Sequence, residues 1–74
     1  MNYILVELQT SNGTTANIVN QYNDLNTAES AYYSICASAV ISSIDTHAVI
    51  LMNENGVTLK NERFIHKTPI DEEL

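Results

Sequence analysis

The sequence predicts an α+β fold in which two β-hairpins flank a single helix and form one four-stranded antiparallel sheet. Two Asn-Gly pairs, at residues 12–13 and 55–56, each separate two stretches that have strand-like apolar patterning. Between the hairpins, a helix-capping sequence precedes a segment with apolar residues at helical spacing. We therefore expect the order ββαββ, with the helix packed on one face of the sheet.

The first hairpin is predicted from residues 3–10 and 14–22. Apolar side chains dominate one parity of its first strand and mix with a carboxylate on the other. The two sets are Ile4, Val6 and Leu8 on one face, and Tyr3, Leu5 and Glu7 on the other. The returning strand is the most polar of the four, so we expect it at a sheet edge.

The helix is predicted to run from about residue 27 to 42, capped by Asn26 or Thr27 with Glu29 as the reciprocal partner. It is apolar around most of its circumference, and three serines at four-residue spacing form the remaining stripe. These are Ser30, Ser34 and Ser38. Two interpretations are open: the stripe faces water, or it is a seam where a second copy's helix packs. We favour the seam as the oligomer interface.

The second hairpin is predicted from an unbroken apolar run at 48–52, which indicates a central strand, and from residues 57–66, with a twist or bulge near Asn61. Pro69 ends this strand, so residues 1–67 form one domain and residues 68–74 a flexible acidic tail. If the helix covers one sheet face, the other meets water or a partner. This is a second reason to expect a homodimer or larger homo-oligomer.

Composition narrows the function classes. The 74 residues include one cysteine, which excludes an intramolecular disulfide and fits a reducing cytoplasm. A net charge of −6 disfavours general nucleic-acid binding and anionic membranes, and no apolar run is long enough to span a membrane. His47, His66 and Cys36 are too scattered for a zinc site, so we expect neither metal nor cofactor.

Catalysis is not expected, because the chain has no phosphate-binding loop, nucleophile elbow or zinc-hydrolase motif. Cys36 lies mid-helix among small apolar residues, where thiols are usually inert. His47 and His66 bound strands and have no acid–base partner nearby in sequence, so we expect surface or strand-end positions. Glu7 is expected on the solvated or edge side of the sheet.

The three cations suggest an anion site. All lie on or just after the last strand, and the bulge expected near Asn61 would bring the first two together despite their opposite parity. If the ligand is a nucleotide, these cations would hold its phosphates, an aromatic ring would stack on the base, and polar side chains would complete the site. The candidates are Lys60, Arg63 and Lys67; Tyr32 or Tyr33; and Thr15 and Asn17.

Four short patterns lie across residues 3–66: Glu7-Leu8-Gln9-Thr10, Tyr22 with Asp24, residues 28–32, and residues 47–52 followed by Gly56. Together they resemble small uncharacterised open reading frames of bacterial prophages. The resemblance implies a phage origin and action in the host bacterial cytoplasm, and it assigns no catalytic residue.

Small phage proteins without enzymatic motifs tend to inhibit host defence or to serve in the virion. The expected function is therefore a non-catalytic, homo-oligomeric inhibitor of anti-phage defence, which either sequesters a nucleotide immune signal or blocks a defence protein. The alternative is a minor virion or assembly protein. A third possibility is a regulatory or assembly subunit that binds by strand addition at a sheet edge.

Overall fold

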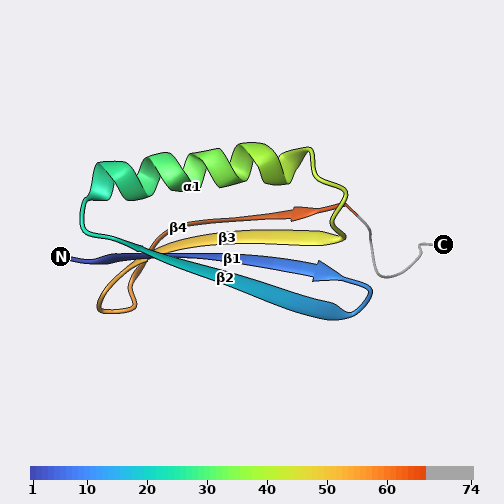
Figure 1. Cartoon of the computed structure of the whole chain (residues 1–74), viewed down its shortest axis with the longest axis horizontal. Helices are drawn as coiled ribbons and strands as arrows, with labels where there is room; N and C mark the ends of the chain where they lie inside the picture. Colours follow the sequence, from blue (N-terminus) through green and yellow to red (C-terminus); the bar gives the residue numbers. More distant parts are fainter. Residues whose placement is uncertain (67–74) are drawn as a thin grey trace.

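The structure, a computed structural model, describes residues 1–66 and consists of one sheet with one helix on a face (Figure 1). The strands are β1 (Tyr3–Ser11), β2 (Thr14–Tyr22), β3 (Thr46–Asn53) and β4 (Thr58–Ile65), and the helix is α1 (Leu25–Val40). The sheet order is β2-β1-β3-β4, and all neighbours are antiparallel. The predicted ββαββ fold is confirmed, with β2 at an edge and β3 inside the sheet. The predicted tail, residues 68–74, lies outside the described residues.

The two hairpin turns use their Asn-Gly pairs differently. In the β1–β2 turn, Asn12 and Gly13 both have positive φ, at 54° and 79°, which matches the twist of a two-residue hairpin. In the β3–β4 turn only Gly56 has positive φ, at 81°. There the Asn53 side chain accepts hydrogen bonds from the backbone N–H groups of Asn55 and Val57, at 2.9 and 3.1 Å. A side-chain acceptor thus organises the longer turn.

The helix begins earlier than predicted, because Asp24 caps it instead of Asn26 or Thr27. Its carboxylate accepts hydrogen bonds from the backbone N–H and the hydroxyl of Thr27, both at 2.9 Å. The backbone hydrogen bond from Thr27 lowers the pKa of Asp24, as expected for a carboxylate at a helix N-terminus. The helix also ends at Val40, two residues before the predicted end, where the Ser42 N–H bonds to the Ala39 carbonyl at 3.2 Å.

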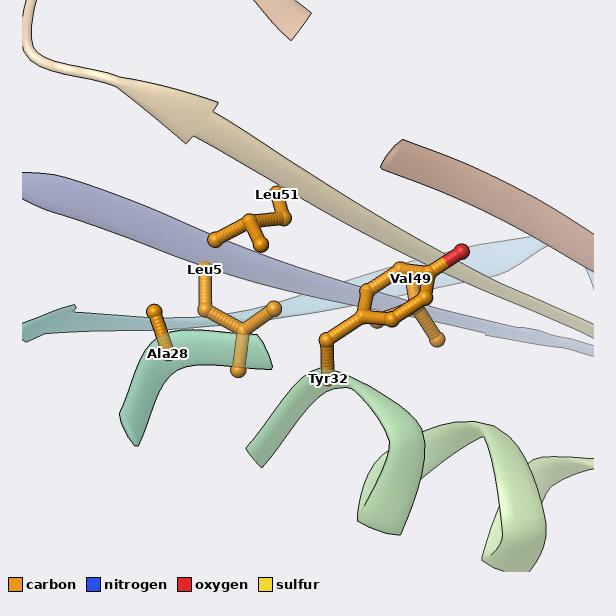
Figure 2. Packing of buried hydrophobic residues seen from close by; sticks show 5 residues of the cluster. All are labelled: Leu5, Ala28, Tyr32, Val49 and Leu51. Carbon is orange, nitrogen blue, oxygen red and sulfur yellow. The ribbon is translucent and has the colours of Figure 1, made fainter. Parts of the chain in front are cut away.

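Strand register decides which side chains lie under the helix. Leu5 is aligned with Leu51, and Glu7 with Val49, so the odd-numbered residues of β1 and β3 share the face that α1 packs on. We call this the covered face. Figure 2 shows the buried cluster between helix and sheet: Leu5, Ala28, Tyr32, Val49 and Leu51. No side chain in this cluster is more than 5% exposed, so the core is small and dry.

The predicted bulge lies closer to the turn than expected. The β3–β4 register shifts between Leu51 and Met52, where Leu51 is aligned with Lys60 and Met52 with Thr58. From Lys60 to Ile65 the ladder is regular. The irregularity expected near Asn61 is therefore present two residues closer to the turn, and side chains beyond Lys60 alternate strictly between the two faces.

The side of the sheet opposite α1 has no element over it within residues 1–66 (Figure 1). We call this the open face. In the same part of the chain, no helix has the length and apolar composition that crossing a membrane requires.

Tyr32 links the core to a measurable pH dependence. Burial, then the hydrogen bond with Cys36, raises the pKa of Tyr32 to about 12, from its ordinary value of 10.0. The neutral phenol stabilises the fold fully below pH 10.0, and this contribution is lost as the pH rises through about 12.

We expect the tyrosinate absorbance titration to contain a component with a pKa of about 12 that Tyr32→Phe lacks. We also expect the free energy of unfolding to fall more steeply across this range in wild type. Equal pH dependence in both proteins would contradict this account.

Candidate functional site

The covered face contains a polar cluster beside the apolar core. Glu7 and His47 extend from β1 and β3 and form a close hydrogen bond between the Glu7 carboxylate and His47 Nε2. Their side chains are 15% and 4% exposed. Gln9 Nε2 donates a second hydrogen bond to the same carboxylate at 2.9 Å. Because a carboxylate only accepts, His47 Nε2 carries the proton, which leaves Nδ1 as the acceptor in the neutral ring.

Ser42 completes the order serine–imidazole–carboxylate that hydrolytic triads use, but its surroundings do not suit a nucleophile. Its Oγ lies 3.4 Å from His47 Nδ1, at the outer limit for such a hydrogen bond, and accepts the Ile44 N–H at 3.3 Å. It also lies just past the C-terminal end of α1, where the helix directs carbonyl oxygens. Such a position disfavours a developing oxyanion, since it needs N–H donors instead. The arrangement is suited to satisfying buried polar groups.

The structure corrects the expectations for His47 and Glu7. His47 is buried, at 3% exposed, instead of lying at the surface, and Glu7 is on the covered face instead of the solvated side. His66 is exposed at the end of β4, as expected, and its Nε2 donates to the Ala39 carbonyl at the end of α1 at 2.8 Å. Glu7 and Leu5 are two residues apart on β1, and this spacing could have indicated that Glu7 lies on the same face as the core. The pairing of β1 with β3, which joins residues 40 apart, was not predicted.

The cations that the sequence grouped are separated by the sheet. Lys60 is aligned with Leu51 and so lies on the covered face, whereas Arg63 is aligned with Ala48 and lies on the open face. Lys60 Nζ is 3.8 Å from the Glu29 carboxylate and 5.6 Å from the Tyr33 ring centroid. The hydrogen bond with Tyr33 raises the pKa of Lys60. The expectation that Lys60 and Arg63 converge was therefore wrong, and Lys67 lies outside the described residues.

The other predicted ligand residues do not gather around either cation. Tyr32 is buried in the core, whereas its neighbour Tyr33 is 56% exposed. Thr15 and Asn17 are exposed on β2, and β2 and β4 lie at opposite edges of the sheet. Asn17 shares a cross-strand row of the open face with Arg63, but three strand spacings of about 4.8 Å, or roughly 14 Å, separate them. The predicted nucleotide ligands that lie within residues 1–66 are therefore not brought together in one chain.

Cys36 lies partly buried in the middle of α1. Burial raises the pKa of the Cys36 thiol, so the reactive thiolate is disfavoured at this position.

The three serines of the predicted stripe, Ser30, Ser34 and Ser38, are all exposed along the helix, as either interpretation of the stripe requires. A shallow depression runs beside the stripe and is lined by Asn26, Thr27, Ser30, Ala31 and Ser34. Within residues 1–66, no three histidine, cysteine or acidic side chains group as metal ligands.

The open face lies on the opposite side of the sheet from the buried core. Its two central strands present apolar side chains in three aligned pairs, followed by one polar pair, Thr10 with Thr46, at the end of the ladder. The pairs are Ile4 with Met52, Val6 with Ile50, and Leu8 with Ala48. Each of these side chains is partly exposed, and Val19, aligned with Val6 on the neighbouring β2, is 58% exposed. The more apolar parity of β1 thus points away from the helix.

Comparison with protein-family models, with curated proteins and with solved structures returns no match. The resemblance to prophage reading frames therefore stays a prediction.

The buried polar pair yields a stability prediction. Replacing either partner alone, in Glu7→Leu or His47→Leu, leaves the other polar group buried without its partner. We expect each single variant to lower the free energy of unfolding by about 3 kcal/mol. The double variant should lose clearly less than the sum, because neither polar group remains. Denaturant unfolding of all four proteins measures this. Additive losses would show that the two side chains do not stabilise the fold as a pair.

Proposed function

We propose that this chain is a non-catalytic binding protein that acts by occupying and blocking a protein partner. The observation that carries the proposal is the separation of Lys60 and Arg63 on opposite faces of the sheet. Nucleotide signals are held through their phosphates, and tight phosphate sites use cationic groups that converge on the same oxygens. Here Lys60 is already engaged by Glu29 and Tyr33, which supports blocking a protein over sequestering a nucleotide.

The charge distribution supports a basic partner. Residues 1–66 carry six carboxylates and two lysine or arginine side chains. The carboxylates are Glu7, Asp24, Glu29, Asp45, Glu54 and Glu62. Glu62 is exposed on β4, and Glu29 is partly exposed on the adjacent flank of α1. An acidic surface of this kind speeds association with a positively charged surface and discriminates against acidic competitors.

The prophage resemblance suggests where the protein acts, which is in the cytoplasm of an infected bacterium. A phage protein that acts stoichiometrically in the host cytoplasm gains from fast association, because it must engage its target before the defence response acts. Long-range attraction provides that speed without a catalytic site. The proposed role is therefore inhibition of an anti-phage defence protein through the flank of α1 and β4 where exposed Glu62 adds a carboxylate beside the Glu29–Lys60 pair, which we call the acidic flank.

Phage plating in bacteria that carry an anti-phage defence system tests this role. We expect expression of the full chain to restore plating, and Glu62→Gln to reduce the restoration because it removes an exposed charge from the acidic flank. Glu54→Gln is the matched control, since it removes the same charge from the β3–β4 turn, where Glu54 accepts the Asn2 N–H. Equal effects of both variants would contradict a localised acidic contact.

A thermal-shift measurement separates the two modes of inhibition. Ligand that binds only the native protein raises its melting temperature, and the blocking mode predicts no rise with cyclic or linear nucleotides. A rise in wild type that Arg63→Ala abolishes would instead establish sequestration.

A further inference from the structure

We propose that the open face of the sheet packs against the open face of a second copy, so that two chains form a four-layer dimer with the helices outside. The proposal does not depend on the blocking function above, because it uses the opposite side of the molecule. It starts from the alternation along β1: Ile4, Val6 and Leu8 lie on the open face, while the covered face receives Glu7 from the same strand. A monomer in water would favour the reverse assignment.

The open face has the layout of a protein–protein interface. Its centre is the apolar block on β1 and β3, which Val19 extends onto β2, and polar side chains on both edge strands lie around that block. Asn17 and Gln21 border it on β2, and Asn61 and Arg63 on β4. Specific interfaces typically have an apolar, desolvated centre and a polar rim.

Charge identifies the occupant as a second copy. None of the six carboxylates within residues 1–66 lies on the open face. Glu7 and Glu62 are aligned with Val49 on the covered face, and the other four lie in α1, its cap, or the turns. Two chains of net charge −6 repel each other, and that repulsion is weakest where no carboxylate must be desolvated. A basic partner finds no carboxylate from residues 1–66 on this face.

The area of the open face is also compatible with a dimer interface. Four strands about 4.8 Å apart and eight residues long, at about 3.3 Å per residue, give roughly 500 Å² per copy. Two copies then bury about 1,000 Å², which is about the smallest area expected of a biological interface and is typical of a weak dimer. Two antiparallel sheets pack in this way about 10 Å apart with their strands nearly aligned.

Two-fold symmetry places Arg63, the one lysine or arginine that residues 1–66 contribute to the open face, away from its symmetry-related copy. Arg63 and Asn17 lie in the same cross-strand row, at opposite edges of the sheet. A two-fold axis parallel to the strands lays β4 of one copy over β2 of the other. Each guanidinium then lies above an amide-rich rim instead of the other guanidinium, which avoids like-charge contact.

Light scattering on the full chain tests the proposal. We expect wild type to have twice the 8.2 kDa chain mass. Ile50→Lys places a charge at the centre of the open face, and it should raise the dimer dissociation constant by about 30-fold or more. The matched control is Ser34→Lys, which adds the same charge to the exposed serine stripe of α1 and should leave the dimer intact.

A second measurement covers the case in which Ile50→Lys fails to fold. If the wild-type dimer is linked to folding, its melting temperature must rise with protein concentration. A wild type that is monomeric, with a melting temperature independent of concentration, overturns the proposal. Dissociation by Ser34→Lys but not by Ile50→Lys overturns it as well, in favour of the helix seam.

Discussion

One helix covers only one face of this four-stranded sheet, and the side-chain alternation along β1 and β3 decides what each face receives. The antiparallel register aligns Leu5 with Leu51 and Glu7 with Val49 under α1. The same register aligns Val6 with Ile50 on the other side. A shift of one residue would exchange the two faces. The dry core, the buried polar pair and the apolar open face therefore all follow from one register.

The covered face includes a polar group where an apolar one would fill the space more simply. The core contains three large, fully buried side chains, Leu5, Val49 and Leu51, and continues toward the end of α1 through the Glu7–His47 pair. Hydrogen bonds from Gln9 and His47 satisfy the carboxylate, which removes much of the cost of burying it. A domain of this length gains limited stability from a core so small. Burial of the open face in the proposed dimer would supply further apolar contact.

Local patterns predicted the fold well, because turns, alternation and caps are encoded by neighbouring residues. Asn12 and Gly13 form the expected turn, and the element order is as predicted. The cap was misplaced by two residues or more, since Asp24, Asn26 and Thr27 are all competent caps and only the geometry of the β2–α1 connection selects Asp24. The bulge near Lys60 was likewise set by the β3–β4 turn.

The candidate site was harder to predict, because it depends on pairings between distant segments. Local sequence does not show that β1 lies beside β3, so His47 and Glu7 were each considered without the other. The grouping of Lys60 with Arg63 required a β-bulge between these two residues. The bulge lies before Lys60 instead, so the two side chains are on opposite faces. Both errors concern which side of a strand a residue faces, and in this fold that property decides which residues can share a site.

The most direct test of the central claim is an isotope-filtered nuclear Overhauser experiment on a mixture of labelled and unlabelled chains, which detects only contacts between copies. A dimer joined through the open face should give cross-copy signals from the side chains of Val6, Ile50 and Met52, and none from Ala31 or Ala37 on α1. Cross-copy signals from the helix, or their absence at every position, would contradict the claim that the open face is covered by a second copy of the chain.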